Sequence, residues 1–139
     1  MTGHYEIASD FKDAYAFLDA FTKELAARGV HNDIIFDIKV AAAEALVNAI
    51  KYGNQNKKGL TVTIDTKVNH DRVELCIKDR GKGFDHTGLE DPTDESHLTR
   101  TRGRGVFLIK KLMDTVEFSD NGSTIKMVKS ITRQEERQS

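Results

Sequence analysis

The stretch EALVNAIKYGN, residues 44–54, is the most informative part of the sequence for the fold and for a candidate site. Its Ala, Leu, Val and Ile residues predict a largely buried helix, in which Glu44 and Asn48 lie four residues apart on one face. Both could be ordinary surface residues of an amphipathic helix, but their apolar neighbours make that interpretation weaker. A polar pair in such surroundings needs a partner. A bound cation is one candidate, because an amide oxygen suits Mg²⁺ and a carboxylate one turn away could activate a hydroxyl or water.

A second segment, DRGKGFD at residues 79–85, directly follows an alternating, strand-like run. Asp79 ends that strand, and at the floor of a pocket its carboxylate could accept a hydrogen bond from an exocyclic amine. Gly81 and Gly83 allow positive φ and a close approach of backbone to ligand. Many tight turns share this pattern, so the segment alone does not define a site.

A third segment, RGRGVFLIKKL at residues 102–112, places Gly103 and Gly105 where a polar segment enters a helix. A glycine-rich helix N-terminus presents free N–H groups and the positive end of the helix dipole, which together favour phosphate. Three alternate arginines add positive charge: Arg100, Arg102 and Arg104. A flexible loop with a solvated basic cluster would explain this segment equally well.

Periodicity predicts the remaining elements. We expect, in order, a strand at 4–9, a helix capped by Ser9 or Asp10 that runs to about Arg28 and is closed by Gly29, and a helix from about Asn32 to near Gly53. Strands at 60–68 and 72–79 follow, joined by a polar turn at 69–71. A helix at 105–114 and a hairpin at 115–131 that turns at Asn121-Gly122 complete the expected order. The polar segment 86–102 is expected to form a binding lid. The predicted fold is an α/β (α+β) two-layer sandwich, with a mixed, mostly antiparallel sheet and helices on one face.

Composition sets broad limits. The 139 residues fit a single domain, expected over residues 1–131, followed by a charged and frayed tail at 132–139. Lys plus Arg number 21 against 22 for Asp plus Glu, which argues against a generic nucleic-acid binder. The sequence shows neither a membrane-span pattern nor a signal-peptide pattern, so we expect a cytoplasmic protein. The single cysteine, Cys76, lies in an alternating run and is expected to be a small core residue.

In this order and spacing, the three segments resemble the N, G1 and G2 boxes of the GHKL ATP-binding superfamily. Within it, the chain resembles the anti-sigma factor serine kinases of bacterial partner-switching systems, and the resemblance covers nearly the whole chain. One departure is Lys51-Tyr52 ahead of Gly53, where many relatives carry a histidine at the second position. Whether Lys51 also touches phosphate is left open.

The resemblance implies a role for each matching residue. Glu44 would be the general base, Asn48 the Mg²⁺ ligand, and Asp79 the residue that reads the adenine amine. Gly81 and Gly83 would shape the floor of the nucleotide site. The residues that would cradle the phosphates are Gly103, Arg104 and Gly105.

The function implied is that of an ATP- and Mg²⁺-dependent serine/threonine kinase. It would phosphorylate an anti-sigma-factor antagonist and sequester a sigma factor. The resemblance also implies a homodimer, the usual state of relatives. Neither direct nucleic-acid binding nor membrane association is implied. The alternative is a non-catalytic, ATP-regulated switch module of the same fold. A sensor-kinase ATPase fragment is a weaker third interpretation.

Overall fold

The computed structural model describes residues 2–57, 59–80 and 104–132. The elements are β1 (Thr2–Ala8), α1 (Phe11–Ala27), α2 (Asn32–Asn48), the π-helix η1 (Ala49–Gly53), β2 (Thr61–Val68), β3 (Arg72–Asp79), β4 (Thr115–Ser119), the 3-10 helix η3 (Asp120–Gly122) and β5 (Thr124–Ser130). Residues 104–112 form a further helix ahead of β4. The expected order of elements is confirmed within these ranges.

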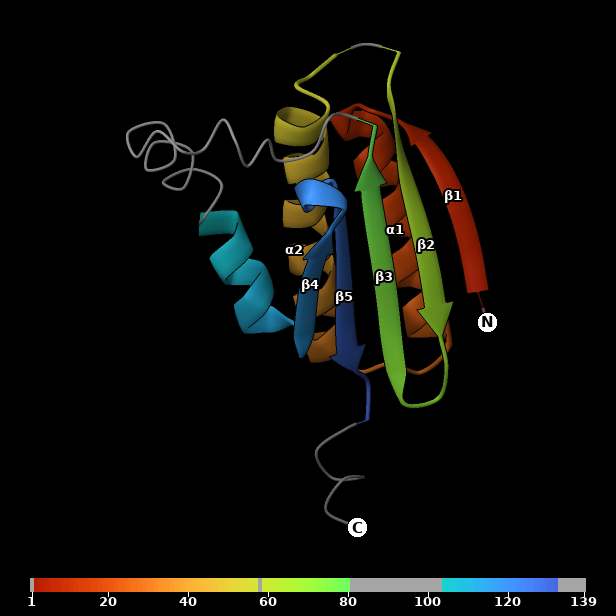
Figure 1. Cartoon of the computed structure of the whole chain (residues 1–139). Helices are drawn as coiled ribbons and strands as arrows, with labels where there is room; N and C mark the ends of the chain where they lie inside the picture. Colours follow the sequence, from red (N-terminus) through yellow and green to blue (C-terminus); the bar gives the residue numbers. More distant parts are fainter. Residues whose placement is uncertain (1, 58, 81–103, 133–139) are drawn as a thin grey trace.

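The five strands form one sheet in the order β1-β2-β3-β5-β4. Every pair of neighbouring strands in the described sheet is antiparallel, so the mixed character that the sequence allowed is absent from these strands. Helices α1 and α2 cover one face, as Figure 1 shows. The two-layer α+β architecture predicted from the sequence is therefore confirmed.

Local chemistry explains where several elements begin and end. The Asp10 side chain accepts a hydrogen bond of 2.7 Å from the backbone N–H of Asp13, which makes Asp10 the N-cap of α1. Gly29 has a φ of +86° just beyond the same helix. Between β2 and β3, Asn69 Oδ1 accepts from the backbone N–H of Arg72 at 3.0 Å and fixes the turn. The sequence predicted all three features.

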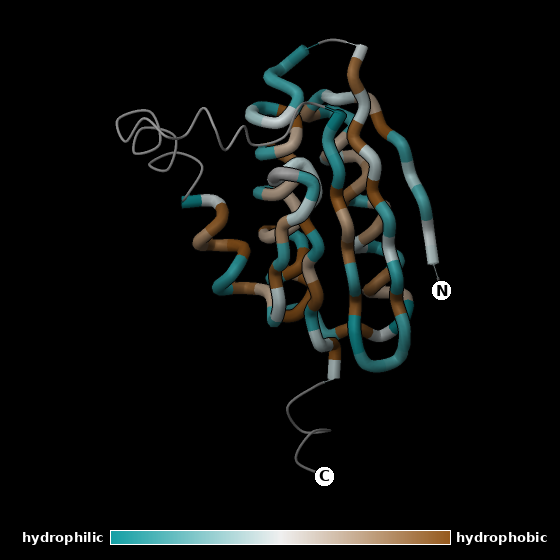
Figure 2. The backbone as a smooth tube through the Cα atoms, viewed as in Figure 1, coloured by the Kyte–Doolittle hydropathy of each residue, from teal (hydrophilic) through white to brown (hydrophobic). Residues whose placement is uncertain are grey.

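The core lies between the sheet and the helices. Apolar and polar residues alternate along β2 and β3, visible as brown and teal bands in Figure 2, so one side of each strand faces the helices. Small side chains on α2 bring that helix close to the sheet; its buried residues include Ala41, Ala42, Ala45 and Leu46. No helix within the described ranges combines the length and apolar content that crossing a membrane requires.

Cys76 corrects one expectation, because it is not a core residue. Val73, Leu75 and Ile77 point into the core, and Cys76 lies out of phase with them on the face that α1 and α2 do not cover. The thiol is half-buried there. Burial raises the pKa of the Cys76 thiol, and the nearby negative charge of Asp65 raises it further.

The end of the second helix also differs from the expected one. The α-helical pattern stops at Asn48, and the chain continues as a π-helical turn from Ala49 to Gly53. The backbone N–H of Asn54 closes this turn with a bond of 2.8 Å to the Ala49 carbonyl. Single π-helical turns of this kind are often found at functional sites.

Candidate functional site

Four separate parts of the chain meet at one end of the sheet. They are the C-terminal part of α2 with η1, the end of β3, the β4–β5 hairpin turn and the first turn of the 104–112 helix. A pocket at this end is lined by Ala45, Asn48, Ala49, Ile77, Asp79, Phe118, Gly122, Ser123 and Ile125. Two residues predicted from different motifs, Asn48 and Asp79, therefore line the same pocket.

Glu44 and Asn48 face the start of the 104–112 helix. A Cβ added to Gly105 would lie 2.7 Å from Glu44 Oε2 and 3.6 Å from Asn48 Nδ2. Gly105 thus lets the first turn of this helix approach both polar side chains closely. This contact brings the first and third predicted motifs together, although 61 residues separate Glu44 from Gly105 in the sequence.

Asn48 has the features of a ligand-binding amide. Its exposed fraction is only 8%. Within the described part of the chain, its side chain has no hydrogen-bond or ion-pair partner, and the same holds for Glu44. Among the described residues, the fully buried side-chain oxygen without a partner is that of Thr66, so the Asn48 amide keeps some contact with solvent and is open to a ligand such as a hydrated cation.

Asp79 lies at the end of β3 with an exposed fraction of 4%. Its backbone N–H donates a bond of 2.9 Å to the Ser123 carbonyl, which attaches the strand end to the β4–β5 turn. A Cβ added to Gly53 would lie 2.1 Å from Asp79 Oδ2. The carboxylate therefore occupies space that is available only because residue 53 is glycine.

Asn54 is a residue that the sequence motifs did not single out. Its side chain is fully buried and donates from Nδ2 to Ser9 Oγ at 2.9 Å and to the Thr61 carbonyl at 3.1 Å. Its Oδ1 accepts from the backbone N–H of Arg80 at 2.8 Å. Asn54 thus joins the starts of α1 and β2 to the residue after Asp79, and helps to hold the pocket wall in place.

The remaining predicted residues fall into two groups. Gly81, Gly83, Gly103 and the expected lid at 86–102 lie outside the described residues. Arg104 is exposed at the start of the 104–112 helix. Lys51, whose contact with phosphate the sequence left open, has its Nζ 5.6 Å from the centroid of the Tyr52 ring.

The arrangement combines three recognition elements. A buried carboxylate, Asp79, sits among apolar residues and can accept a hydrogen bond from a flat, amino-bearing ring. Asn48 and Glu44 supply an amide and a carboxylate on the adjoining helix face. The helix that begins beside Gly105 supplies an N-terminus, where N–H groups and the dipole favour an anion. Together these features suit a nucleotide bound with a divalent cation.

The fold and this pocket define a nucleotide-binding α+β domain, and comparison with known proteins places it more closely. Residues 7–129 match the histidine kinase-like ATPase domain, and the chain belongs to this family, which implies ATP binding. The GHKL-type resemblance seen in the sequence is confirmed at this level.

Similar proteins include bacterial kinases of comparable length. The chain is 32% identical over 117 residues to the serine-protein kinase RsbW of Staphylococcus epidermidis, covering 78% of this chain and 74% of that protein. It is 34% identical over 118 residues to RsbW of Staphylococcus aureus strain MSSA476, with coverages of 78% and 74%. For RsbW of Listeria monocytogenes the identity is 29% over 114 residues, with coverages of 77% and 73%.

Proposed function

We propose that this protein is an ATP-dependent serine/threonine kinase of a partner-switching system, which phosphorylates a small anti-sigma-factor antagonist and sequesters a sigma factor. The observation that carries this proposal is the convergence of Glu44, Asn48 and Gly105 beside the pocket that holds Asp79. The names of the relatives, serine-protein kinases, support the reaction type.

Each residue has a role in this proposal. Asp79 accepts a hydrogen bond from the adenine amine, and Gly81 and Gly83 shape the floor beneath the base. Arg104 and the N–H groups beside Gly103 and Gly105 bind the phosphates. Asn48 offers its amide oxygen to Mg²⁺, which when bound neutralises charge on the phosphate oxygens. The near-complete burial of Asn48 and its lack of a described partner fit this role.

In this proposal Glu44 is the general base. Its carboxylate accepts the proton of a substrate serine or threonine hydroxyl as that oxygen bonds to the γ-phosphorus. The bond from the γ-phosphorus to the bridging oxygen breaks, and ADP leaves. Such in-line transfer depends mainly on positioning and on charge neutralisation. Glu44 lies one helical turn before Asn48, so both can reach the same phosphate group.

Calorimetry with Mg-ATP tests the nucleotide assignment through Asp79→Asn. The wild-type protein should bind, and the variant should bind about tenfold or more weakly, because a hydrogen bond to a charged group contributes ~1.5–3 kcal/mol. Asparagine keeps the shape of the side chain, so the fold should be retained, as urea unfolding would verify. Equal affinity of the two proteins would remove Asp79 from the adenine site, and absence of binding by the wild type would refute ATP binding itself.

Asn48→Ala tests the cation assignment separately. Alanine is the best helix former, so α2 should remain folded. Nucleotide affinity in the presence of Mg²⁺ should fall, whereas affinity measured in EDTA should match that of the wild type. Lys39→Ala, at an exposed position on the same helix, is the matched control and should change neither value. Unfolding of Asn48→Ala with unchanged Mg²⁺ dependence would show a purely structural residue.

A further inference from the structure

Phe118 is the only aromatic residue among those that line the described pocket. In the sheet register Phe118 on β4 pairs with Ile125 on β5, and Ile125 pairs with Ile77 on β3. These three side chains form a row across the helix-facing side of the sheet. Asp79 follows Ile77 by two residues on the same side of β3, so the row ends beside the buried carboxylate.

The exposure of Phe118 distinguishes it from its neighbours in this row. Ile77 and Ile125 have exposed fractions of 1% and 7%, whereas that of Phe118 is 39%. The aromatic contacts among the described residues join Tyr5, Phe17 and Phe21, and none involves Phe118. A large aromatic ring thus stays partly uncovered at a pocket wall, on the side of the sheet that otherwise forms the core.

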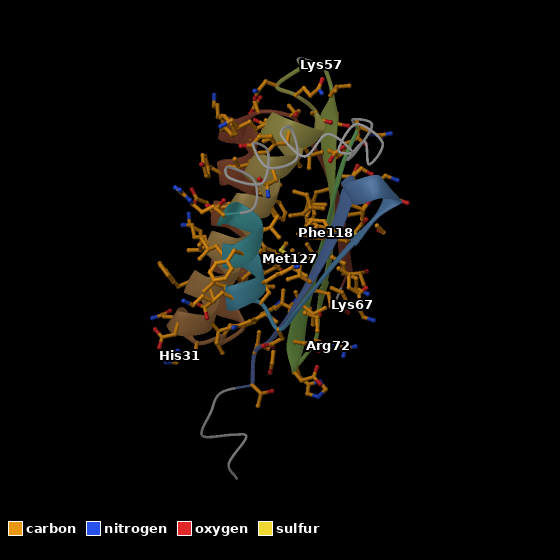
Figure 3. All side chains as sticks on the ribbon, turned by 60° about the vertical axis from the view of Figure 1, so that its left-hand side comes forward. His31, Lys57, Lys67, Arg72, Phe118 and Met127 are labelled. Atoms are coloured by element: carbon orange, nitrogen blue, oxygen red, sulfur yellow. The ribbon has the colours of Figure 1, made fainter. Side chains whose placement is uncertain are left out.

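The turn that follows Phe118 is firmly attached to the pocket. Figure 3 labels Phe118 near the η3 end of the β4–β5 hairpin. Within the turn, Thr124 Oγ1 donates to Asp120 Oδ2 at 2.8 Å and the Ser123 N–H donates to the Asp120 carbonyl at 3.2 Å. The Ser123 carbonyl accepts from the Asp79 N–H at 2.9 Å. These bonds hold the hairpin against the strand end that carries Asp79.

We propose that Phe118 packs against the face of the nucleobase whose amino edge is bound by Asp79. This inference rests on the proposed function, since it assigns a wall of the same nucleotide pocket. A purine is flat and has both a polar edge and an apolar face. A carboxylate alone recognises the edge, and an aromatic side chain nearby supplies a surface for the face. Phe118 therefore contributes to affinity through the base and not through the phosphates.

Substitution at Phe118 separates these contributions. Phe118→Ala should weaken ATP and ADP binding by roughly tenfold, within the range measured for base–aromatic stacking, and Phe118→Tyr should largely preserve binding. Phe118→Leu, which keeps apolar bulk without an aromatic ring, should fall between them. The control is Phe36→Ala on α2, which removes a more exposed phenyl ring, 65% exposed, away from the pocket lining. Urea unfolding of each variant would verify folding.

The chain contains no tryptophan, which allows a direct optical test. In the F118W variant, tryptophan emission should change on titration with ADP, with a midpoint that matches the calorimetric Kd. In F36W, emission should stay constant over the same titration. A change at position 118 without one at position 36 would show that ADP binding alters the surroundings of residue 118, as a residue in the wall of the base site requires.

The outcomes distinguish this inference from the proposed function. If the wild type binds ADP but Phe118→Ala binds it equally well, Phe118 is not a wall of the base site and the nucleotide assignment stands. Constant emission from F118W at saturating ADP would lead to the same conclusion. If the wild type binds neither ATP nor ADP by calorimetry, the proposed function itself fails, and the assignment of Phe118 fails with it.

Discussion

A Glu44→Gln variant should bind Mg-ATP almost normally and yet transfer phosphate at least ~100-fold more slowly than the wild type, because a general base contributes ~10²–10⁴ in rate. Glutamine preserves the size and hydrogen-bonding capacity of the side chain that packs beside Gly105. It cannot accept the substrate proton at neutral pH. Binding and turnover should therefore separate, which calorimetry and incorporation of labelled phosphate into host proteins would measure.

The same experiment distinguishes a kinase from a non-catalytic switch. Glu24→Gln, at a surface position on α1, is the matched control and should retain full transfer. If the wild type labels no host protein while ATP still governs partner capture in a pull-down, the molecule is a switch module without transfer. If Glu44→Gln transfers phosphate at the wild-type rate, the protein is a kinase with a different base. Phosphosite mapping on the labelled partner would identify the acceptor residue.

Gly53→Ala should damage both stability and nucleotide binding, although it adds a single methyl group. The new Cβ would lie 2.1 Å from Asp79 Oδ2 and 2.9 Å from Asp79 Cβ, so the buried carboxylate would have to move. Overpacking of this kind costs ~1–3 kcal/mol of stability. Because Asp79 would leave its position, the loss of ATP affinity should equal or exceed that of Asp79→Asn. Urea unfolding and calorimetry measure the two effects.

A double-mutant cycle tests whether Gly53→Ala acts by displacing the Asp79 carboxylate. With Asp79→Ala in place, adding Gly53→Ala should cost less stability than it does in the wild type, since the carboxylate is absent and only the 2.9 Å approach to the Cβ of residue 79 remains. An equal cost in both backgrounds would mean that residue 53 acts through the π-helical turn and not through Asp79. Wild-type stability together with wild-type binding in Gly53→Ala would contradict the close contact.

Much of the fold was predictable because local signals and tertiary packing agree. The cap at Asp10 and the turn at Asn69 depend on bonds to neighbours in sequence, and both occur as expected. The prediction that Cys76 is a core residue is wrong, although the sequence contains the signal that places it outside the core. Val73, Leu75 and Ile77 share one phase of the alternation, and Cys76 has the other. Cysteine is generally buried, but in a strand the phase of the alternation decides which face a side chain takes.

The site was predictable only in part, for a physical reason. Glu44, Asn48 and Asp79 belong to recognisable motifs, and Asn48 and Asp79 line the same pocket in the structure. No sequence feature identifies Asn54 as a site residue, because an asparagine after a helix-ending glycine is typical of ordinary turns. Its partners, which include Ser9 and Arg80, are distant in sequence and become neighbours only in the folded sheet. Phe118 likewise acquires its position through strand register.

In the π-helical turn from Ala49 to Gly53, the number of residues determines the direction in which the residues after the turn point. The Asn54 N–H bonds to the Ala49 carbonyl five residues earlier, so removing one residue would convert this turn to the four-residue spacing of an α-helix and change the direction in which the chain leaves it. Gly53 would then no longer face Asp79, and Asn54 would point away from Ser9 and Arg80. A single-residue deletion here would thus misplace the residues that hold the pocket wall, whereas a longer loop elsewhere on the surface would be tolerated.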